Sequence, residues 1–163
     1  KNKRPVGKTY WPFSLSSLFV KFSYSVITLL VALLLTSVSR AEVSSIHISS
    51  RLDPNAIIIT QVDIVFVYSQ ELLEQFPETK TDWYSKQRQF IAAAGANLDV
   101  VSVFIPQGFD SETASLPARR NDALKVFVFA QHDDSKAAPV DISELSNVLV
   151  EIDAFGILVS RRD

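Results

Sequence analysis

The stretch Ile57–Tyr68 constrains the fold of this chain more than any other segment. It is rich in β-branched and aromatic residues and contains neither Gly nor Pro, a composition typical of a strand. One of its faces is mostly apolar, and the other is polar only in the middle, at Gln61 and Asp63. A strand that is apolar on nearly both faces belongs inside a sheet with another layer packed over each side. We therefore expect a sandwich with this strand at its centre.

Weaker patterns predict the other strands of the domain. An edge strand precedes the central one, and a turn at 51–55 connects the two. The last apolar stretch forms either two short strands or one strand bent around Gly156. The element order β-β-α-β-β-β favours a mainly β, antiparallel sandwich. The strands are expected over 42–50, 98–105, 124–130 and 148–160.

The segment 69–94 is predicted to be a small helical insert. Ser69 is expected to cap two helical turns, which Pro77 ends. A second helix follows from about residue 81, with an apolar stripe that lays Trp83 and Phe90 across a sheet and that only Gln87 interrupts.

Residues 1–41 are predicted to be a signal peptide or an N-terminal membrane anchor. Basic residues precede an apolar run, and small residues at Ser39 and Ala41 indicate cleavage after Ala41. The alternative is a retained anchor, because the uncharged stretch 22–39 reaches the length of a short spanning helix. Under both interpretations the sandwich domain, residues 42–163, is exported to the periplasm.

The predicted domain is acidic and contains no cysteine. Residues 42–163 carry 10 Lys and Arg against 18 Asp and Glu, a net charge of −8. This balance argues against binding to nucleic acid or to anionic lipid. Without cysteine, disulfides, thiolate metal sites and thioether lipidation are excluded. We predict no cofactor and no metal site.

No catalytic motif is present. Four widely spaced glycines do not form a phosphate loop, and no Gly-x-Ser-x-Gly elbow occurs. His132-Asp133-Asp134 is the only cluster of metal-type side chains, which we interpret as a solvated turn, and we expect His47 to face solvent. The sequence therefore predicts that the chain is not an enzyme and has no catalytic residues.

Asp63 interrupts the central strand. An unpaired buried carboxylate there would cost several kcal/mol, on the order of the penalties known for buried charges. We expect that it faces the wet side of the sheet or pairs with Lys125; the alternative is that it belongs to a ligand pocket.

Two loops are the predicted partner-binding surface, because loops held by a rigid sandwich are where binding usually resides. They are 51–56 and 107–123, the second of which places a Phe near two Arg as a protein-contact patch. The alternative for the second loop is that Phe109 and Leu116 pack onto the core. The residues concerned are Leu52, Asp53, Asn55, Phe109, Arg119 and Arg120.

Several segments follow one another in a distinctive order. They are Leu52–Asn55, Val62–Tyr68, Leu72-Leu73, Trp83-Tyr84, Leu98–Val103, Pro106, Leu116-Pro117 and Val126–Ala130. This order resembles the outer-membrane lipoprotein family of type VI secretion systems over about residues 43–160. The resemblance implies a transthyretin-like β-sandwich that docks the periplasmic part of the inner-membrane core protein to the outer membrane. Family members carry a lipobox Cys after the apolar core, whereas this chain has no Cys.

The leading hypothesis is a non-enzymatic periplasmic scaffold or docking component of a bacterial envelope complex, of the type VI secretion kind. Its partner would be a protein of the cell envelope, such as the inner-membrane core protein. The alternative is a periplasmic module that binds a small ligand or peptide in the mouth of the sandwich. A third hypothesis is an envelope hydrolase that uses a pair of carboxylates.

Overall fold

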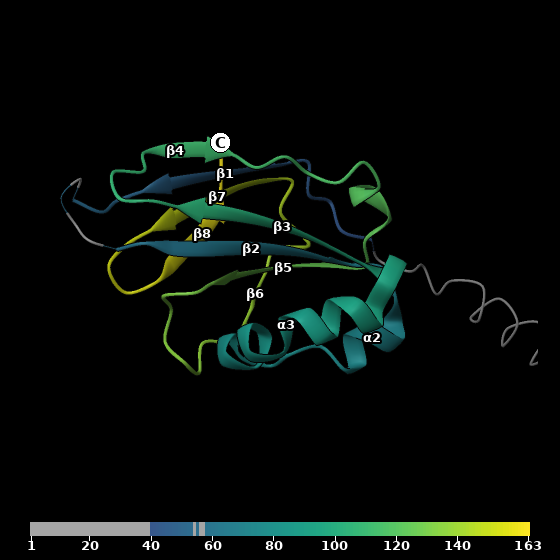
Figure 1. Ribbon diagram of the computed structural model, residues 1–163. Helices are drawn as coiled ribbons and strands as arrows, with labels where there is room; N and C mark the ends of the chain where they lie inside the picture. The colour runs from purple at the N-terminus through teal and green to yellow at the C-terminus, as the bar shows by residue number, and fades with distance from the viewer. Residues whose placement is uncertain (1–39, 54, 56–57) are drawn as a thin grey trace, which may run out of the picture. The chain divides into compact units, whose positions relative to one another are not determined.

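The central strand β2 (Thr60–Val67) lies between β3 (Leu98–Ile105) and β5 (Lys125–Ala130), and both neighbours run antiparallel to it. The computed structural model describes residues 40–53, 55 and 58–163. In these residues the strands form two four-stranded sheets, ordered β3-β2-β5-β6 and β4-β1-β7-β8 (Figure 1). The remaining strands are β1 (Ser45–Ser50), β4 (Ser111–Thr113), β6 (Val140–Asp141), β7 (Asn147–Ile152) and β8 (Ile157–Arg161).

The two faces of β2 are buried against different layers. Val62, Ile64 and Phe66 point between the sheets, where the larger apolar cluster also contains residues of β1 and β7. Val65 and Val67 point the other way, toward a smaller cluster beneath the helices. The prediction of a mainly β sandwich with its long apolar strand at the centre is confirmed.

The helical insert covers the outer face of the β2 sheet (Figure 1). It consists of α2 (Gln70–Glu74), α3 (Lys80–Ala94) and a short 3₁₀ turn, η1 (Gly95–Asn97). Thr79 caps α3 by accepting a hydrogen bond from the backbone N–H of Asp82 at 3.1 Å. Ser69 occupies the predicted N-cap position of α2, but its side chain makes no capping hydrogen bond.

Trp83 fixes α3 to the sheet. Its ring is fully buried and stacks on Phe129 of β5, with 5.1 Å between ring centroids and 7° between ring planes. An aromatic pair of this kind adds about 0.5–1.5 kcal/mol to the stabilisation from burial alone. Phe76, which follows α2, stacks in turn on Phe127 at 4.5 Å. The predicted packing of the second helix across a sheet is confirmed.

The β1 sheet departs from the sequence prediction in two ways. First, β1 is an inner strand, because β4 pairs with it in a part of the 107–123 segment that we predicted to be a loop. A second short element, the 3₁₀ turn η2 (Arg120–Asp122), also lies in that segment. Second, β1 and β7 pair in parallel, whereas every other pairing in the described residues is antiparallel. Alternation of apolar residues shows which side of a strand is buried and does not encode its direction.

Both apolar clusters can be followed through the described residues. Every buried member of the two apolar clusters lies between Ala41 and Ile152. We therefore expect residues 40–163 to fold as a unit. Within the described part of the chain no helix has the length and hydropathy needed to cross a bilayer. Of the predicted signal or anchor segment 1–41, residues 1–39 lie outside the described residues, whereas Arg40 and Ala41 are described and Ala41 is buried.

Candidate interaction site

Four loops gather at one end of the sandwich. They connect β1 to β2, β3 to β4, β5 to β6 and β7 to β8, and they meet because the strand ends that they join are paired: Ser50 with Ile152, Thr60 with Ile105, and Val62 with Ala130. In Figure 1 this loop end lies on the left. The described residues of the predicted binding loop 51–56, which follows β1, belong to this end. So does the first part of the predicted binding loop 107–123, which follows β3.

A pocket of about 260 Å³ opens between the first two of these loops. Three of the predicted partner-binding residues, Leu52, Asp53 and Phe109, line it together with Ile58 and Pro106. Asn55 lies outside the pocket, and its backbone N–H donates to the Asp53 carboxylate at 2.8 Å, which shapes the turn. Phe109 also packs against the core, so the alternative that we gave for it holds as well.

The loop end exposes large apolar side chains. Of the five exposed large hydrophobic residues in the described part of the chain, three lie here: Ile59, Phe104 and Phe155, with exposed fractions of 60, 61 and 88%. We call these three residues the loop-end patch. Exposed aromatic residues are typical of protein interfaces. These three residues were not predicted to be part of the binding surface. For Phe104 the reason is that the apolar pattern of 98–105 does not show where the covering helices end.

His132 holds the loops of this end together. Its Nδ1 lies 3.0 Å from the Thr60 hydroxyl, while Nε2 lies 3.0 and 3.1 Å from the carbonyl oxygens of Asp153 and Gly156. Because carbonyl oxygens only accept, Nε2 carries a hydrogen, and in the neutral ring Nδ1 then accepts from the Thr60 hydroxyl. These bonds tie the β7–β8 hairpin, with Phe155 at its tip, to the start of β2.

Asp133 provides the second tie to this hairpin. Its carboxylate accepts the backbone N–H of Ile157 at 3.0 Å. Burial raises the pKa of Asp133, and the nearby His132 opposes that rise. The predicted solvated turn is therefore wrong for His132 and Asp133, which are half-buried and bonded. In the described residues no three His, Cys, Asp or Glu side chains come together as metal ligands.

Arg119 and Arg120 lie at the opposite end of the sandwich, so the predicted patch that joins them to Phe109 is wrong. Arg119 donates to both carboxylate oxygens of Asp99, at 2.8 and 3.0 Å, and its guanidinium carbon lies 3.9 Å from the ring centroid of Tyr68. The hydrogen bond from Arg119 holds the pKa of Asp99 below its usual value, and burial together with Asp99 raises the pKa of Tyr68. Arg119 is thus held by bonds within the domain.

Asp63 is fully buried between β2 and α3. Its Oδ1 accepts from Gln61 Nε2 at 2.7 Å and Ser102 Oγ at 2.6 Å, and its Oδ2 accepts from Trp83 Nε1 at 2.9 Å and Gln87 Nε2 at 2.8 Å. These four donors fill the acceptor capacity of a carboxylate. The predicted pairing of Asp63 with Lys125 is wrong, since Lys125 binds Asp141 at 2.7 Å. The prediction that Asp63 faces the wet side of the sheet is also wrong, because Asp63 is fully buried.

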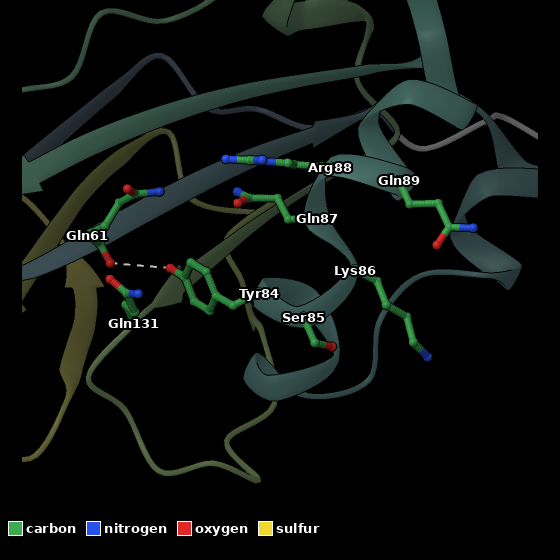
Figure 2. A pocket seen from close by; sticks show the side chains of 8 residues that line it. All are labelled: Gln61, Tyr84, Ser85, Lys86, Gln87, Arg88, Gln89 and Gln131. Atoms are coloured by element: carbon green, nitrogen blue, oxygen red, sulfur yellow. Dashed lines mark hydrogen bonds between the residues drawn. The ribbon is translucent and has the colours of Figure 1, made fainter.

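A polar groove of about 510 Å³ lies above this network, between α3 and β2 (Figure 2). Figure 2 shows the side chains of Gln61, Tyr84, Gln87 and Arg88 directed toward one another. The Tyr84 hydroxyl donates to the backbone oxygen of Gln61 at 3.3 Å. Burial and the neighbouring Asp63 raise the pKa of Tyr84, so its hydroxyl stays protonated.

Comparisons with known proteins give structural similarity only. No protein-family model matches the chain, and no curated protein matches its sequence. One similar structure is Serratia marcescens Lip, described as a membrane-bound component of the type VI secretion system, with a TM-score of 0.48, 14% identity and coverage of 74% of this chain and 99% of that one. Another is the type VI secretion lipoprotein TssJ1 from Pseudomonas aeruginosa, with a TM-score of 0.48, 6% identity and coverage of 74% and 97%. Similarity at this level does not assign a family.

Proposed function

We propose that this chain is a non-enzymatic docking component of a bacterial envelope complex, of the type VI secretion kind, and that it binds its protein partner through the loop end. The observation that supports this proposal is the loop-end patch beside the pocket of Leu52, Asp53 and Phe109. A few large apolar side chains near the centre of an interface usually provide most of its affinity.

The rigidity of the loop end supports the same proposal. His132 and Asp133 fix the hairpin that carries Phe155 to the start of β2. A loop that is already ordered loses less conformational entropy on binding, which favours affinity. The domain would hold its partner in the periplasm, with residues 1–41 acting as a signal peptide or an anchor and residues 42–163 as the docking domain.

The test is binding to the periplasmic part of the inner-membrane core protein of a type VI secretion system from the same organism. Phe155→Ser should weaken the measured affinity by about 30-fold, the effect of losing roughly 2 kcal/mol from an aromatic anchor. Ile91→Ser is the matched control, because Ile91 is 37% exposed and lies on α3, outside the patch. Equal affinities for the two variants, or no binding by the native chain, would count against the proposal.

A further inference from the structure

Two of the side chains that line the polar groove are cationic, on a domain that is acidic overall. Lys86 and Arg88 are among the described residues that line it, and none of those residues is acidic. All 18 Asp and Glu of the chain lie in the part that the structure describes, and the ion pairs found there use other cations. In Figure 2 the guanidinium of Arg88 extends over Gln87 toward Gln61, and Lys86 points away toward the rim.

The buried carboxylate below the groove orients two amides on its floor. Gln61 and Gln87 each donate a side-chain N–H to Asp63. Their Nε2 atoms are therefore directed inward, which leaves both carbonyl oxygens as acceptors for a molecule in the groove. Because Asp63 is itself fully buried, it sets the direction of these groups without contacting a ligand.

β3 lies beside β2, the strand whose Gln61 lines the groove. β3 is the end strand of its sheet, so its outer backbone groups have no strand partner among the described residues. Phe104, exposed by 61%, is the cross-strand partner of Gln61 and lies on the same face. An open edge accepts an extended segment by main-chain hydrogen bonding, with side-chain pockets providing selectivity.

We infer that this groove binds an acidic protein segment in extended conformation. A carboxylate of the segment pairs with the fork of N–H donors of Arg88. Backbone N–H groups of the segment donate to the carbonyl oxygens of Gln61 and Gln87, and an apolar side chain packs on Phe104. The groove shares no lining residue with the loop-end pocket, and of the loop-end patch only Phe104 belongs to this site as well.

The experiment measures fluorescence anisotropy of a fluorescein-labelled peptide of alternating Glu and Val, titrated with the full chain in detergent. The matched probe is the same peptide with Lys in place of each Glu. The acidic peptide should bind at least about tenfold more tightly than the basic one, because only the acidic peptide can pair with Arg88. Equal binding of the two peptides overturns the inference.

Variants locate the peptide on the protein. Arg88→Gln should weaken binding of the acidic peptide by about tenfold, whereas Arg162→Gln, with the same change in charge at an exposed position of the C-terminus, should weaken it less than about twofold. Phe104→Ser should also weaken binding. Arg88 is exposed, so its replacement leaves the fold intact, and a circular dichroism spectrum confirms this for each variant. Equal effects of Arg88→Gln and Arg162→Gln overturn the inference.

Two further measurements separate this site from other possibilities. Phe155→Ser should bind the acidic peptide as well as the native chain does, so failure of the docking proposal leaves this result unaffected. An acidic polysaccharide, polygalacturonate, should not displace the peptide at equal charge concentration, because it cannot pair with the β3 edge. Displacement that depends on Arg88 would assign the groove to a glycan and overturn the peptide inference.

Discussion

Trp83→Phe tests the central polar contact of the domain. The change removes the indole N–H that donates to Asp63 Oδ2 at 2.9 Å, and it keeps an aromatic ring to stack on Phe129. A hydrogen bond to a buried charged group contributes about 1.5–3 kcal/mol, and the smaller ring leaves a void that costs about 1 kcal/mol more. The free energy of unfolding of residues 40–163 should therefore fall by about 2.5–4 kcal/mol.

Urea unfolding followed by circular dichroism measures this loss, and the dependence of the free energy on urea should not change. The same substitution is then made in an Asp63→Leu background, where the indole N–H has no carboxylate to bind. There Trp83→Phe should cost no more than the packing part, about 1 kcal/mol, because the change also removes a buried indole N–H that has lost its acceptor. The difference between the two backgrounds is the coupling energy of the pair, expected at about 1.5–3 kcal/mol. Equal costs in both backgrounds would refute the assignment of Asp63 as the acceptor of the indole N–H.

Three further predictions concern the hairpin, the far end and the start of the domain. In Gly156→Ala the new Cβ would clash with Asp133 Oδ1, so Asp133 must release the N–H of Ile157, and the positive φ of Gly156 adds backbone strain. Unfolding should become about 1–2 kcal/mol easier in urea, and only the part due to backbone strain should remain in an Asp133→Ala background. Arg119→Ala should lower the melting temperature at pH 7. Because the folded pKa of Asp99 lies below its unfolded value, the difference in melting temperature between the variant and the native chain should shrink as the pH falls below about 3.9. A difference in melting temperature that grows at low pH would contradict this. Residues 42–163 should be about 1–2 kcal/mol less stable to urea than residues 40–163, since Ala41 is buried and its N–H donates to the carbonyl oxygen of Ala123 at 2.8 Å. Equal stabilities would show that Ala41 does not stabilise the core.

Much of the fold could be predicted from local pattern. The strand at 98–105 begins and ends at the expected residues, and the helix that carries Trp83 begins one residue before its expected start. β4 could not be predicted, because its three residues are all exposed and are held only by their pairing with β1. Pairing between distant segments decides such elements, and a single sequence carries no local record of it.

The candidate site could be predicted only in part, because contacts between distant segments also decide which of its residues come together. Leu52, Asp53 and Phe109 come together because the loops that carry them follow strands that end at the same edge of the sandwich. Arg119 does not join them, because Asp99 and Tyr68 hold it at the other end of β2. Eight residues of strand span about 26 Å at the usual rise per residue, which no side chain can bridge. Loop membership alone therefore does not place residues on one surface.

The contact between Asp63 and Gln87 could have been predicted from two interruptions taken together. Asp63 breaks an apolar strand, and Gln87 breaks the apolar stripe of the helix expected to cover that strand. A buried carboxylate needs donors, and a buried amide needs an acceptor, so each interruption supplies what the other lacks. The structure places them 2.8 Å apart. Gln61 and Gln87 each donate a side-chain N–H to Asp63, so their side-chain carbonyl oxygens are the polar atoms that face the groove. The burial of one carboxylate in the core therefore determines the hydrogen-bonding groups of a surface that the carboxylate does not reach.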